Sequence, residues 1–180
     1  DPLWSRGLGD VYKRQQQELS YLDTVLEELS RAETERDLIE IRQELQEQGY
    51  LKAPKGSKQR PAATAAPMEF TVSDGFRVLV GRNNKQNDRL TLKLANNNDI
   101  WFHTKNIPGS HTILVTDGRT PTESALLDAA RLAAAHSKGK SSSQVPVDYT
   151  QVRHVHKPAG AKPGMVIYEN YHTMYVTPEE

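Results

Sequence analysis

Hydrophobic positions in the first third of the chain repeat at the period of an amphipathic helix. Four leucines lie three, four and three residues apart, which is the narrow apolar stripe of a coiled coil. They are Leu19, Leu22, Leu26 and Leu29. This spacing predicts a helix that begins near Gln16 and packs through the leucine stripe.

A second helix is predicted after the interruption "SRAETERD". Thr34, followed three residues later by Asp37, resembles a capping box and favours a helix start at that point. The three, four, three spacing resumes at Leu38, Ile41, Leu45 and Gln48. Gly49 lies where a left-handed C-terminal cap is expected, so that Tyr50 and Leu51 can pack back over the last turn.

Residues 16–52 are therefore predicted to be a coiled-coil fragment made of two helical segments. The simplest arrangement is one arm of an antiparallel coiled coil whose partner arm lies upstream and is missing. A self-contained helical hairpin is the alternative, and it is less favoured because isolated helices of this length are marginally stable in water.

Two segments flank the coiled-coil fragment and follow neither a helical nor a strand period. Residues 1–15, "DPLWSRGLGDVYKRQ", are interpreted as a non-native fusion scar or mis-assembled lead, and we exclude them from the fold prediction. Residues 53–67 contain three prolines and three basic residues without any acid. That composition predicts a flexible linker.

From Met68 onward the pattern changes to short alternating segments separated by turns, as in β-strands. "EFTVSDGFRVLVGR" predicts a hairpin with Asp74 and Gly75 as its two-residue turn. "RLTLKLA" alternates, with leucines at every second position, and predicts another strand. Further strands are expected in "DIWFHTK", "HTILVT", "SSSQVPVDYTQVRHVHK" and "GMVIYENYHTMYV", with "PAGAKPG" joining the last two.

Only one helix is predicted in this second part, in "PTESALLDAARLAAAHSK". Pro121 opens it, and either Thr122 or Ser124 can cap it. Its apolar face is rich in alanine, which permits close docking on a sheet. The fold class is therefore α+β, an antiparallel or mixed β-sheet with one main helix, preceded by the helical coiled-coil fragment.

Composition excludes several classes of protein. The chain has no cysteine, so it has no disulfide or thiolate metal site, and this fits a reducing cytoplasmic location. No apolar run approaches the roughly 20 residues that span a bilayer, and no signal peptide is visible. The net charge is zero, but residues 16–52 hold ten acidic and four basic residues, whereas residues 68–180 hold eleven acidic and thirteen basic residues.

The sequence gives little support for a catalytic or metal-binding site. Five histidines are candidate metal ligands: His103, His111, His154, His156 and His172. The pair His154 and His156 would lie on one face of a strand, but zinc needs three or four converging ligands. Ser110 and His111 are strand neighbours that face opposite ways, and "GKS" at 139–141 ends a helix instead of opening one. We expect no catalytic residue, no metal and no cofactor.

The residues themselves favour nucleic-acid binding as the interpretation. The stretch "GRNNKQNDR", residues 81–89, places cations among side-chain amides, which contact phosphate, sugar and base edges. Such a stretch is often only a solvated loop. Here it is accompanied by Trp101, Phe102, His103 and Lys105, and by "VRHVHK" and "GAKPG", so that aromatic rings alternate with cations as single-stranded RNA requires. One of the neighbours Trp101 and Phe102 is expected to face the core.

Long motifs resemble a known family. They are "GRNNKQND", "LTLKLA", "DIWFHTKNIPGSHTILV", "LLDAARLAAAHSK" and "VPVDYTQVRHVHKPAGAKPGMVIYENYHTMYV". Together they resemble the C-terminal RNA-binding domain, NFACT-R, of the NFACT family, in proteins of the RqcH type that are also called fibronectin-binding protein A. We assign residues 68–180 to this domain. "YLDTVLEELSRAE" and "DLIEIRQELQEQGYLK" resemble the end of the family's middle coiled coil.

The resemblance implies a role in bacterial ribosome-associated quality control. Family members bind a large ribosomal subunit that carries an obstructed chain on tRNA, recruit alanyl-tRNA and promote untemplated C-terminal alanine tails. The expected partners are therefore large-subunit RNA and alanyl- and peptidyl-tRNA, without a membrane. The chemistry belongs to the ribosome, so we expect a positioning factor and not an enzyme.

The candidate RNA-binding residues lie in one polar stretch, its neighbours across the sheet, and a turn whose backbone N–H groups could meet phosphate. They are Arg82, Asn83, Asn84, Lys85, Gln86, Asn87, Arg89, Trp101, His103, Lys105, Pro108, Gly109, Ser110 and His111. Each also has a purely structural interpretation: the asparagines can cap turns, and Gly109 can serve only to allow a positive φ.

Two functions from other classes stay open. The first is a surface adhesin with fibronectin as its partner, which the older family name suggests and which requires an export route. The second is a hydrolase that uses the histidines and would hold a metal. An RNA-binding module predicts instead an affinity that falls steeply with salt.

Overall fold

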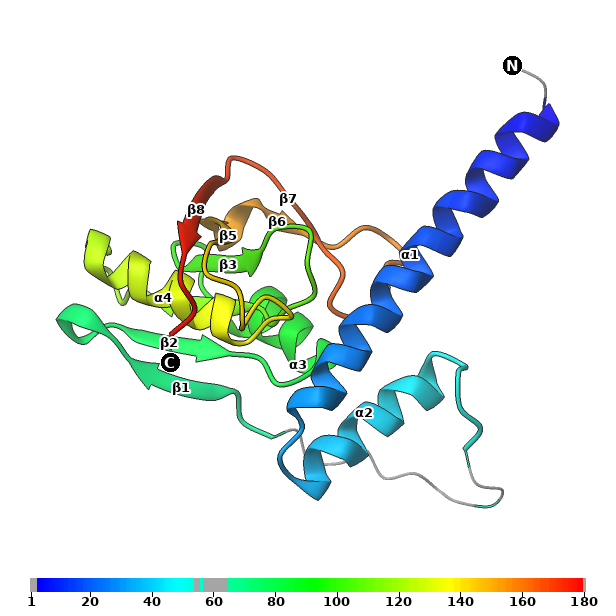
Figure 1. Cartoon of the computed structure of the whole chain (residues 1–180), viewed down its shortest axis with the longest axis horizontal. Helices are drawn as coiled ribbons and strands as arrows, with labels where there is room; N and C mark the ends of the chain where they lie inside the picture. Colours follow the sequence, from blue (N-terminus) through cyan, green and yellow to red (C-terminus); the bar gives the residue numbers. More distant parts are fainter. Residues whose placement is uncertain (1–2, 54–55, 57–64, 180) are drawn as a thin grey trace.

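The computed structural model describes residues 3–53, 56 and 65–179. A long N-terminal helix projects from a body in which a twisted sheet carries helices on both faces (Figure 1). Most of the predicted linker and the first two residues of the predicted non-native lead lie outside the described residues. The described helices are too short or too polar to cross a membrane.

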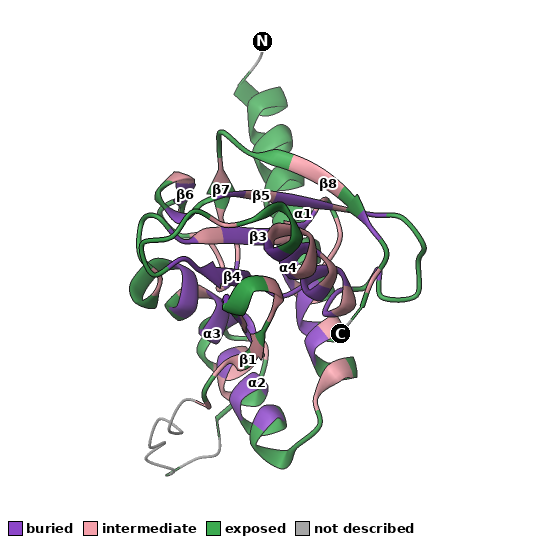
Figure 2. Cartoon of the chain, turned by 90° about the vertical axis from the view of Figure 1, so that its left-hand side faces the viewer, coloured by how far each residue is buried: buried purple, intermediate pink, exposed green. Residues whose placement is uncertain are grey.

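The N-terminal part is a pair of helices, α1 (Leu3–Arg31) and α2 (Glu35–Glu47). The predicted capping box is confirmed, because the Thr34 hydroxyl accepts from the Asp37 N–H and the Asp37 carboxylate accepts from the Thr34 N–H. Gly49 has φ +85°, as predicted for a left-handed cap. The helix α1 begins at Leu3 and not near Gln16, although residues 3–20 are exposed along their whole length (Figure 2).

The face that α1 buries is not the predicted leucine stripe. Tyr21 and Val25 pack with Ile41 of α2 in a small apolar cluster. Leu19 and Leu26 are 58% and 63% exposed. Leu22 is partly buried against this cluster, as predicted, but Leu29 is also exposed. The prediction that α1 packs through the leucine stripe therefore holds inside this chain only at Leu22, because the aromatic ring of Tyr21 fills the space under α2. A missing partner arm on the leucine stripe stays a prediction.

The second part contains a six-stranded antiparallel sheet in the order β1-β2-β4-β3-β5-β8. The strands are Met68–Thr71, Arg77–Val80, Thr112–Val115, Ile100–Thr104, Val145–Gln151 and His172–Val176, in that spatial order. A separate pair is formed by β6 (Val155–His156) and β7 (Ile167–Tyr168). The predicted hairpin between β1 and β2 is confirmed, and Asp74 and Gly75 supply its positive φ angles of 62° and 76°. The predicted two-residue turn is wrong, because residues 72–76 join the strands through the 3-10 helix η1 (Ser73–Gly75).

Helix α4 (Glu123–Ala135) covers one face of the sheet, and Thr122 caps it as predicted. Its buried alanines let the helix approach closely, so that Phe102, Leu114 and Val147 pack directly beneath it. This apolar layer is the largest core cluster among the described residues.

The opposite face of the sheet is covered by a second helical segment that the sequence prediction missed. Asn83 caps α3 (Asn84–Arg89), which continues into the five-residue π-helix η2 (Leu90–Leu94). The prediction of a strand in "RLTLKLA" is therefore wrong, and so is the prediction of a single helix. Leu90 is buried while Leu92 and Leu94 are 39% and 54% exposed, because the asparagine cap starts a helix in which alternate leucines cannot share one face.

Candidate nucleic-acid interface

Four amide side chains of the predicted RNA-facing stretch are buried. Asn83, Asn84, Gln86 and Asn87 are 4%, 0%, 2% and 1% exposed, respectively. They lie where α3 meets the helix pair α1–α2. The prediction that these amides face solvent is wrong. Glu40 and Glu44 of α2 accept from Asn83 and Asn84, the Gln86 side chain donates to the Ala65 carbonyl, and the Asn87 side-chain oxygen accepts from the His111 N–H.

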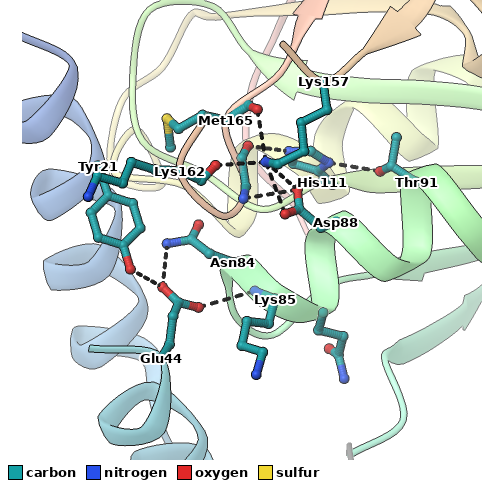
Figure 3. Close-up of polar contacts among 12 residues, drawn as sticks. Tyr21, Glu44, Asn84, Lys85, Asp88, Thr91, His111, Lys157, Lys162 and Met165 are labelled. Atoms are coloured by element: carbon teal, nitrogen blue, oxygen red, sulfur yellow. Dashed lines mark hydrogen bonds and ion pairs between the residues drawn. The ribbon is translucent and has the colours of Figure 1, made fainter. Parts of the chain in front are cut away.

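The carboxylate of Glu44 organises this contact between α2 and α3 (Figure 3). It accepts from the Tyr21 hydroxyl at 2.5 Å, from the Asn84 side chain at 3.2 Å and from the backbone N–H of Lys85 at 3.1 Å. Burial raises the pKa of Glu44, and these donors oppose that rise. One turn earlier, Glu40 accepts from the Asn83 side chain at 2.7 Å.

A second carboxylate in the same contact is less well satisfied. Glu28 of α1 is 2% exposed, and no side chain donates a hydrogen bond to either of its carboxylate oxygens. Burial and the nearby Glu44 raise its pKa well above the ordinary value. The positive charge of Arg31 opposes this rise in the pKa of Glu28. Arg31 lies 3.2 Å from the Glu27 carboxylate and donates to the Ser110 hydroxyl at 2.9 Å.

The three cations of the predicted stretch remain closer to solvent. Lys85 is exposed and pairs with Glu47 of α2 at 2.9 Å. Arg82 donates to the carbonyl of Ala66. Arg89, at the end of α3, is exposed. RNA contact by these three residues stays a prediction.

Trp101 and Phe102 are both buried, on opposite faces of β3. Phe102 lies under α4, and Trp101 lies in the second apolar cluster with Leu90, Val152 and Val155. The prediction that one of them faces the core is confirmed by Phe102, and the other is buried as well, because α3, η2 and the β6–β7 pair cover the second face. Trp101 is 1% exposed and cannot act as an open stacking surface.

The predicted neighbours of Trp101 adjoin a cavity. His103 is half-buried, with its ring 5.7 Å from the indole and inclined by 7°. Its ring nitrogens lie 2.6 Å from the Thr104 carbonyl oxygen and 3.2 Å from that of Gly109. Burial lowers its pKa. Lys105, 34% exposed, reaches Asp148 at 3.3 Å and lies 4.8 Å from the centre of the Tyr171 ring.

The turn at Pro108–His111 is used for folding contacts. The N–H of Ser110 donates to the His136 carbonyl, and the N–H of His111 donates to the Asn87 side chain. These two N–H groups are therefore not available to a phosphate. Gly109 has no positive φ. It is required because a Cβ there would lie 2.7 Å from the Thr104 hydroxyl and 3.0 Å from Ser137.

His111 is a buried, neutral part of the framework. Its ring joins the Thr91 hydroxyl at 2.8 Å and the Gly164 carbonyl at 3.0 Å. Burial, together with the nearby His103, lowers the pKa of His111 to about 3. Gly164 belongs to the "PAGAKPG" segment, so the His111 ring, just before β4, connects this loop to η2.

An ion pair that the sequence reasoning missed holds the same loop. Lys157 lies 3.0 Å from the Asp88 carboxylate and donates to the carbonyls of Lys162 and Met165 (Figure 3). The N–H of Gly164 donates to Asp88 at 3.0 Å. No signal in the sequence pairs Asp88 with Lys157, because the two residues are 69 positions apart.

Exposed cations surround this second face of the sheet. Arg89 and Lys93 lie on α3 and η2. Arg153 lies in the short 3-10 helix η3 (Val152–His154), where it donates to the Asn98 side chain. Because Leu90 and Val152 pack on the Trp101 side of the sheet, the segments that carry these cations lie over the same face. The exposed Asn97 and Asn98 lie beside Arg153, whose backbone N–H donates to the Asn97 carbonyl.

The histidines do not form a metal site. His154 lies in a short 3-10 helix and His156 in β6, and His156 approaches Glu169 at 3.4 Å. No cluster of three or more His, Asp or Glu side chains with metal-binding geometry exists in the part of the chain that the structure describes.

Family models and known proteins match the chain over most of its length. Residues 67–170 match the model "NFACT protein RNA binding domain", and residues 6–64 match "NFACT N-terminal and middle domains". The chain is 46% identical over 166 residues to the Rqc2 homolog RqcH of Bacillus subtilis (strain 168), covering 91% of this chain and 29% of that protein. It is 43% identical to the Rqc2 homolog RqcH of Streptococcus suis (strain 05ZYH33), covering 90% and 28%.

A solved structure has the same arrangement of helices and sheet. The C-terminal part of the fibronectin/fibrinogen-binding protein from Streptococcus suis superposes with a TM-score of 0.89 at 40% identity, covering 97% of this chain and 70% of that chain. The chain spans less than a third of the length of the curated relatives. With more than half of its residues matched by the RNA-binding domain model, the chain belongs to the NFACT family and carries that family's RNA-binding domain, preceded by a fragment of its N-terminal and middle domains.

Proposed function

We propose that the chain is the RNA-binding end of a cytoplasmic ribosome-associated quality control factor. In this proposal it binds the large ribosomal subunit with peptidyl-tRNA and supports untemplated C-terminal alanine tailing of stalled chains. The observation that carries the proposal is the match to the NFACT RNA-binding domain, at 46% identity to a protein named as an Rqc2 homolog.

The charge of the second sheet face supports RNA as the partner. Exposed Arg89, Lys93 and Arg153 gather there, whereas the carboxylates on the same face are buried or paired, as for Asp88 and Asp148. Cations with amide neighbours bind phosphate and give an affinity that falls with salt.

The proposed role is positioning and not catalysis. The two histidines nearest the cavity, His103 and His111, have lowered pKa values and hydrogen-bond partners within the fold. A general base needs a titration near the working pH and access to substrate. These two side chains therefore suit a rigid framework.

Co-sedimentation with purified large ribosomal subunits tests the proposal. The chain is spun with subunits, with and without peptidyl-tRNA, over a series of salt concentrations. Binding is expected at low salt, with a steep loss as salt rises. The double variant Lys93→Glu/Arg153→Glu is expected to bind at least tenfold more weakly.

The matched control reverses two exposed cations of the helical part, in the variant Arg42→Glu/Lys52→Glu. It carries the same change of net charge and is expected to bind like the parent. Equal loss in both variants would indicate only a bulk charge effect. No binding of the parent at any salt would refute the proposal.

Fibronectin binding is a second candidate, favoured by the printed description of the Streptococcus suis structure as a fibronectin/fibrinogen-binding protein. Immobilised fibronectin and purified subunits can be compared with the same protein preparation. Saturable fibronectin binding that persists at high salt, with no subunit binding, would favour the adhesin.

A further inference from the structure

The sheet face opposite α4 is hollowed where α1 crosses the end of β3. A cavity of about 420 Å³ lies there, which we call the β3 pocket. Its walls come from Ser20, Asp23 and Thr24 of α1, from the β3 end and following turn, and from residues 164–168. This volume is within the range of roughly 300–1,000 Å³ that holds small organic ligands, and it is far too small for an RNA helix.

Aromatic rings form one side of the β3 pocket. Trp101, His103 and Tyr168 all line it, with the Tyr168 ring 4.7 Å from the indole. Flat surfaces of this kind bind unstacked nucleobases. The rings are also held in place: the Tyr168 hydroxyl donates to Asp148 at 2.5 Å, and the His103 ring lies against two backbone carbonyls.

The floor of the pocket carries no positive charge that would favour phosphate. His103 and His111 both have lowered pKa values because they are buried, so each is neutral at physiological pH. Lys105, which directly follows β3, lies at the rim, next in the chain to Thr104 and Asn106, which line the pocket. The exposed Asp23 carboxylate of α1 also lines the wall and disfavours phosphate inside. A neutral floor with a cation at the rim suits a base inside and its phosphate outside.

One polar group in the pocket wall has no partner. The indole N–H of Trp101 is buried and makes no hydrogen bond. An unsatisfied buried donor costs about 1–3 kcal/mol. Ring nitrogens and carbonyl oxygens of a nucleobase are acceptors of the kind that this group lacks, whereas the other ring donors of the pocket are already engaged.

We propose that the β3 pocket binds a single unstacked nucleobase of the RNA, with its plane against the half-buried His103 or Tyr168 ring and an acceptor atom on the edge of the base facing the Trp101 indole N–H. The inference rests on the proposed RNA-binding function and adds the site and chemical class of what is recognised. The ribose and phosphate remain at the rim beside Lys105.

Nuclear magnetic resonance of the ¹⁵N-labelled chain tests the proposal directly. The chain has two tryptophans, Trp4 and Trp101, so two indole N–H signals are expected, and the variant Trp4→Phe assigns them. The four ribonucleoside 5′-monophosphates and short single-stranded RNA oligonucleotides are added in turn, with ribose 5-phosphate as the control. At least one base is expected to shift the Trp101 signal, while ribose 5-phosphate leaves it in place.

The second test measures the RNA affinity of a variant in which a side chain blocks the β3 pocket. Ser20→Phe places a ring in the mouth of the pocket, and Leu19→Phe makes the same change on the neighbouring, 58% exposed position that does not line it. Loss of one stacked base corresponds to roughly 1–3 kcal/mol, or about 5- to 150-fold in affinity. That weakening of RNA binding is expected for Ser20→Phe alone, at an unchanged melting temperature.

The outcomes separate the pocket from the proposed function. If RNA binds, and Lys93→Glu/Arg153→Glu weakens it, but the Trp101 signal stays fixed and Ser20→Phe binds like Leu19→Phe, the pocket proposal is overturned and the RNA-binding function stands. An equal shift with ribose 5-phosphate also overturns it. If the parent binds neither subunits nor oligonucleotides, both proposals fail.

Discussion

The two faces of the sheet differ in composition, although neighbouring residues of the same strand, β3, point to them. On the α4 face, Phe102 packs among alanines, valines and leucines, and the layer is closed and apolar. On the other face, Trp101 packs with fewer apolar residues, beside histidines, an unpaired indole N–H and a cavity. Strand β3 therefore separates a face that stabilises the domain from a face that has room to bind.

The face that carries Trp101 is held together by polar contacts between distant parts of the chain, whereas the face under α4 is held together by apolar packing. The loop at 157–165 is held by Lys157 and Asp88, and α3 is held by Glu40 and Glu44 of the helical part. Buried polar groups of this kind specify geometry at a cost in desolvation. Changes on the two faces are therefore expected to differ in both size and kind.

Phe102→Ala is expected to give the largest effect, because it removes a fully buried ring beneath α4. A loss of about 3–5 kcal/mol in the free energy of unfolding is expected from the lost burial and the cavity left behind. Urea unfolding followed by circular dichroism measures it. Tyr175→Ala, at a 66% exposed ring, is the control, and a comparable loss there would contradict the comparison of the faces.

Lys157→Ala is expected to cost roughly 1–3 kcal/mol, because it leaves the partly buried Asp88 carboxylate without its cation. The loss comes from desolvation and not from packing. Adding Asp88→Asn removes the unpaired charge, so the double variant is expected to recover part of the stability. A double variant that is less stable than Lys157→Ala would contradict an unpaired buried charge as the source of the loss. Both values come from the same urea unfolding assay.

Glu28→Gln is expected to stabilise the chain on the order of 1 kcal/mol at pH 7.5. Burial and Glu44 raise the pKa of Glu28 above its ordinary 4.5, while Arg31 opposes the rise. The folded state therefore holds the proton more tightly, and stability is lost as pH rises from about 4.5 through the folded pKa. Melting temperatures of parent and variant should converge near pH 4 and separate toward neutral pH. A constant difference at every pH would refute this account.

Arg89→Ala is expected to have the smallest effect, and only on RNA binding. Removing one phosphate contact weakens binding about equally for all sequences and lowers the salt slope by about one. Filter binding over a salt series measures both quantities. Arg131→Ala on α4, the matched cation of the other face, should leave the slope unchanged, and a similar decrease there would place RNA on both faces.

Local signals in the sequence determined much of the architecture. Thr34 with Asp37 marked the start of α2, Asp74 with Gly75 marked the hairpin, and the alanine-rich segment marked α4. Each depends on residues within a few positions of one another, so short-range chemistry is sufficient. The long motifs also determined the family.

Only the tertiary structure decided which polar residues are accessible. The amides at 83–87 look like an open RNA-binding stretch, yet all four are buried, and Asn83 and Asn84 donate to Glu40 and Glu44, about 40 positions away. Trp101 looks like an exposed stacking surface, yet α3 and residues 152–168 cover it. Exposure depends on which distant segment covers a side chain, and the position of that segment is set by packing over the whole fold and not by the local pattern.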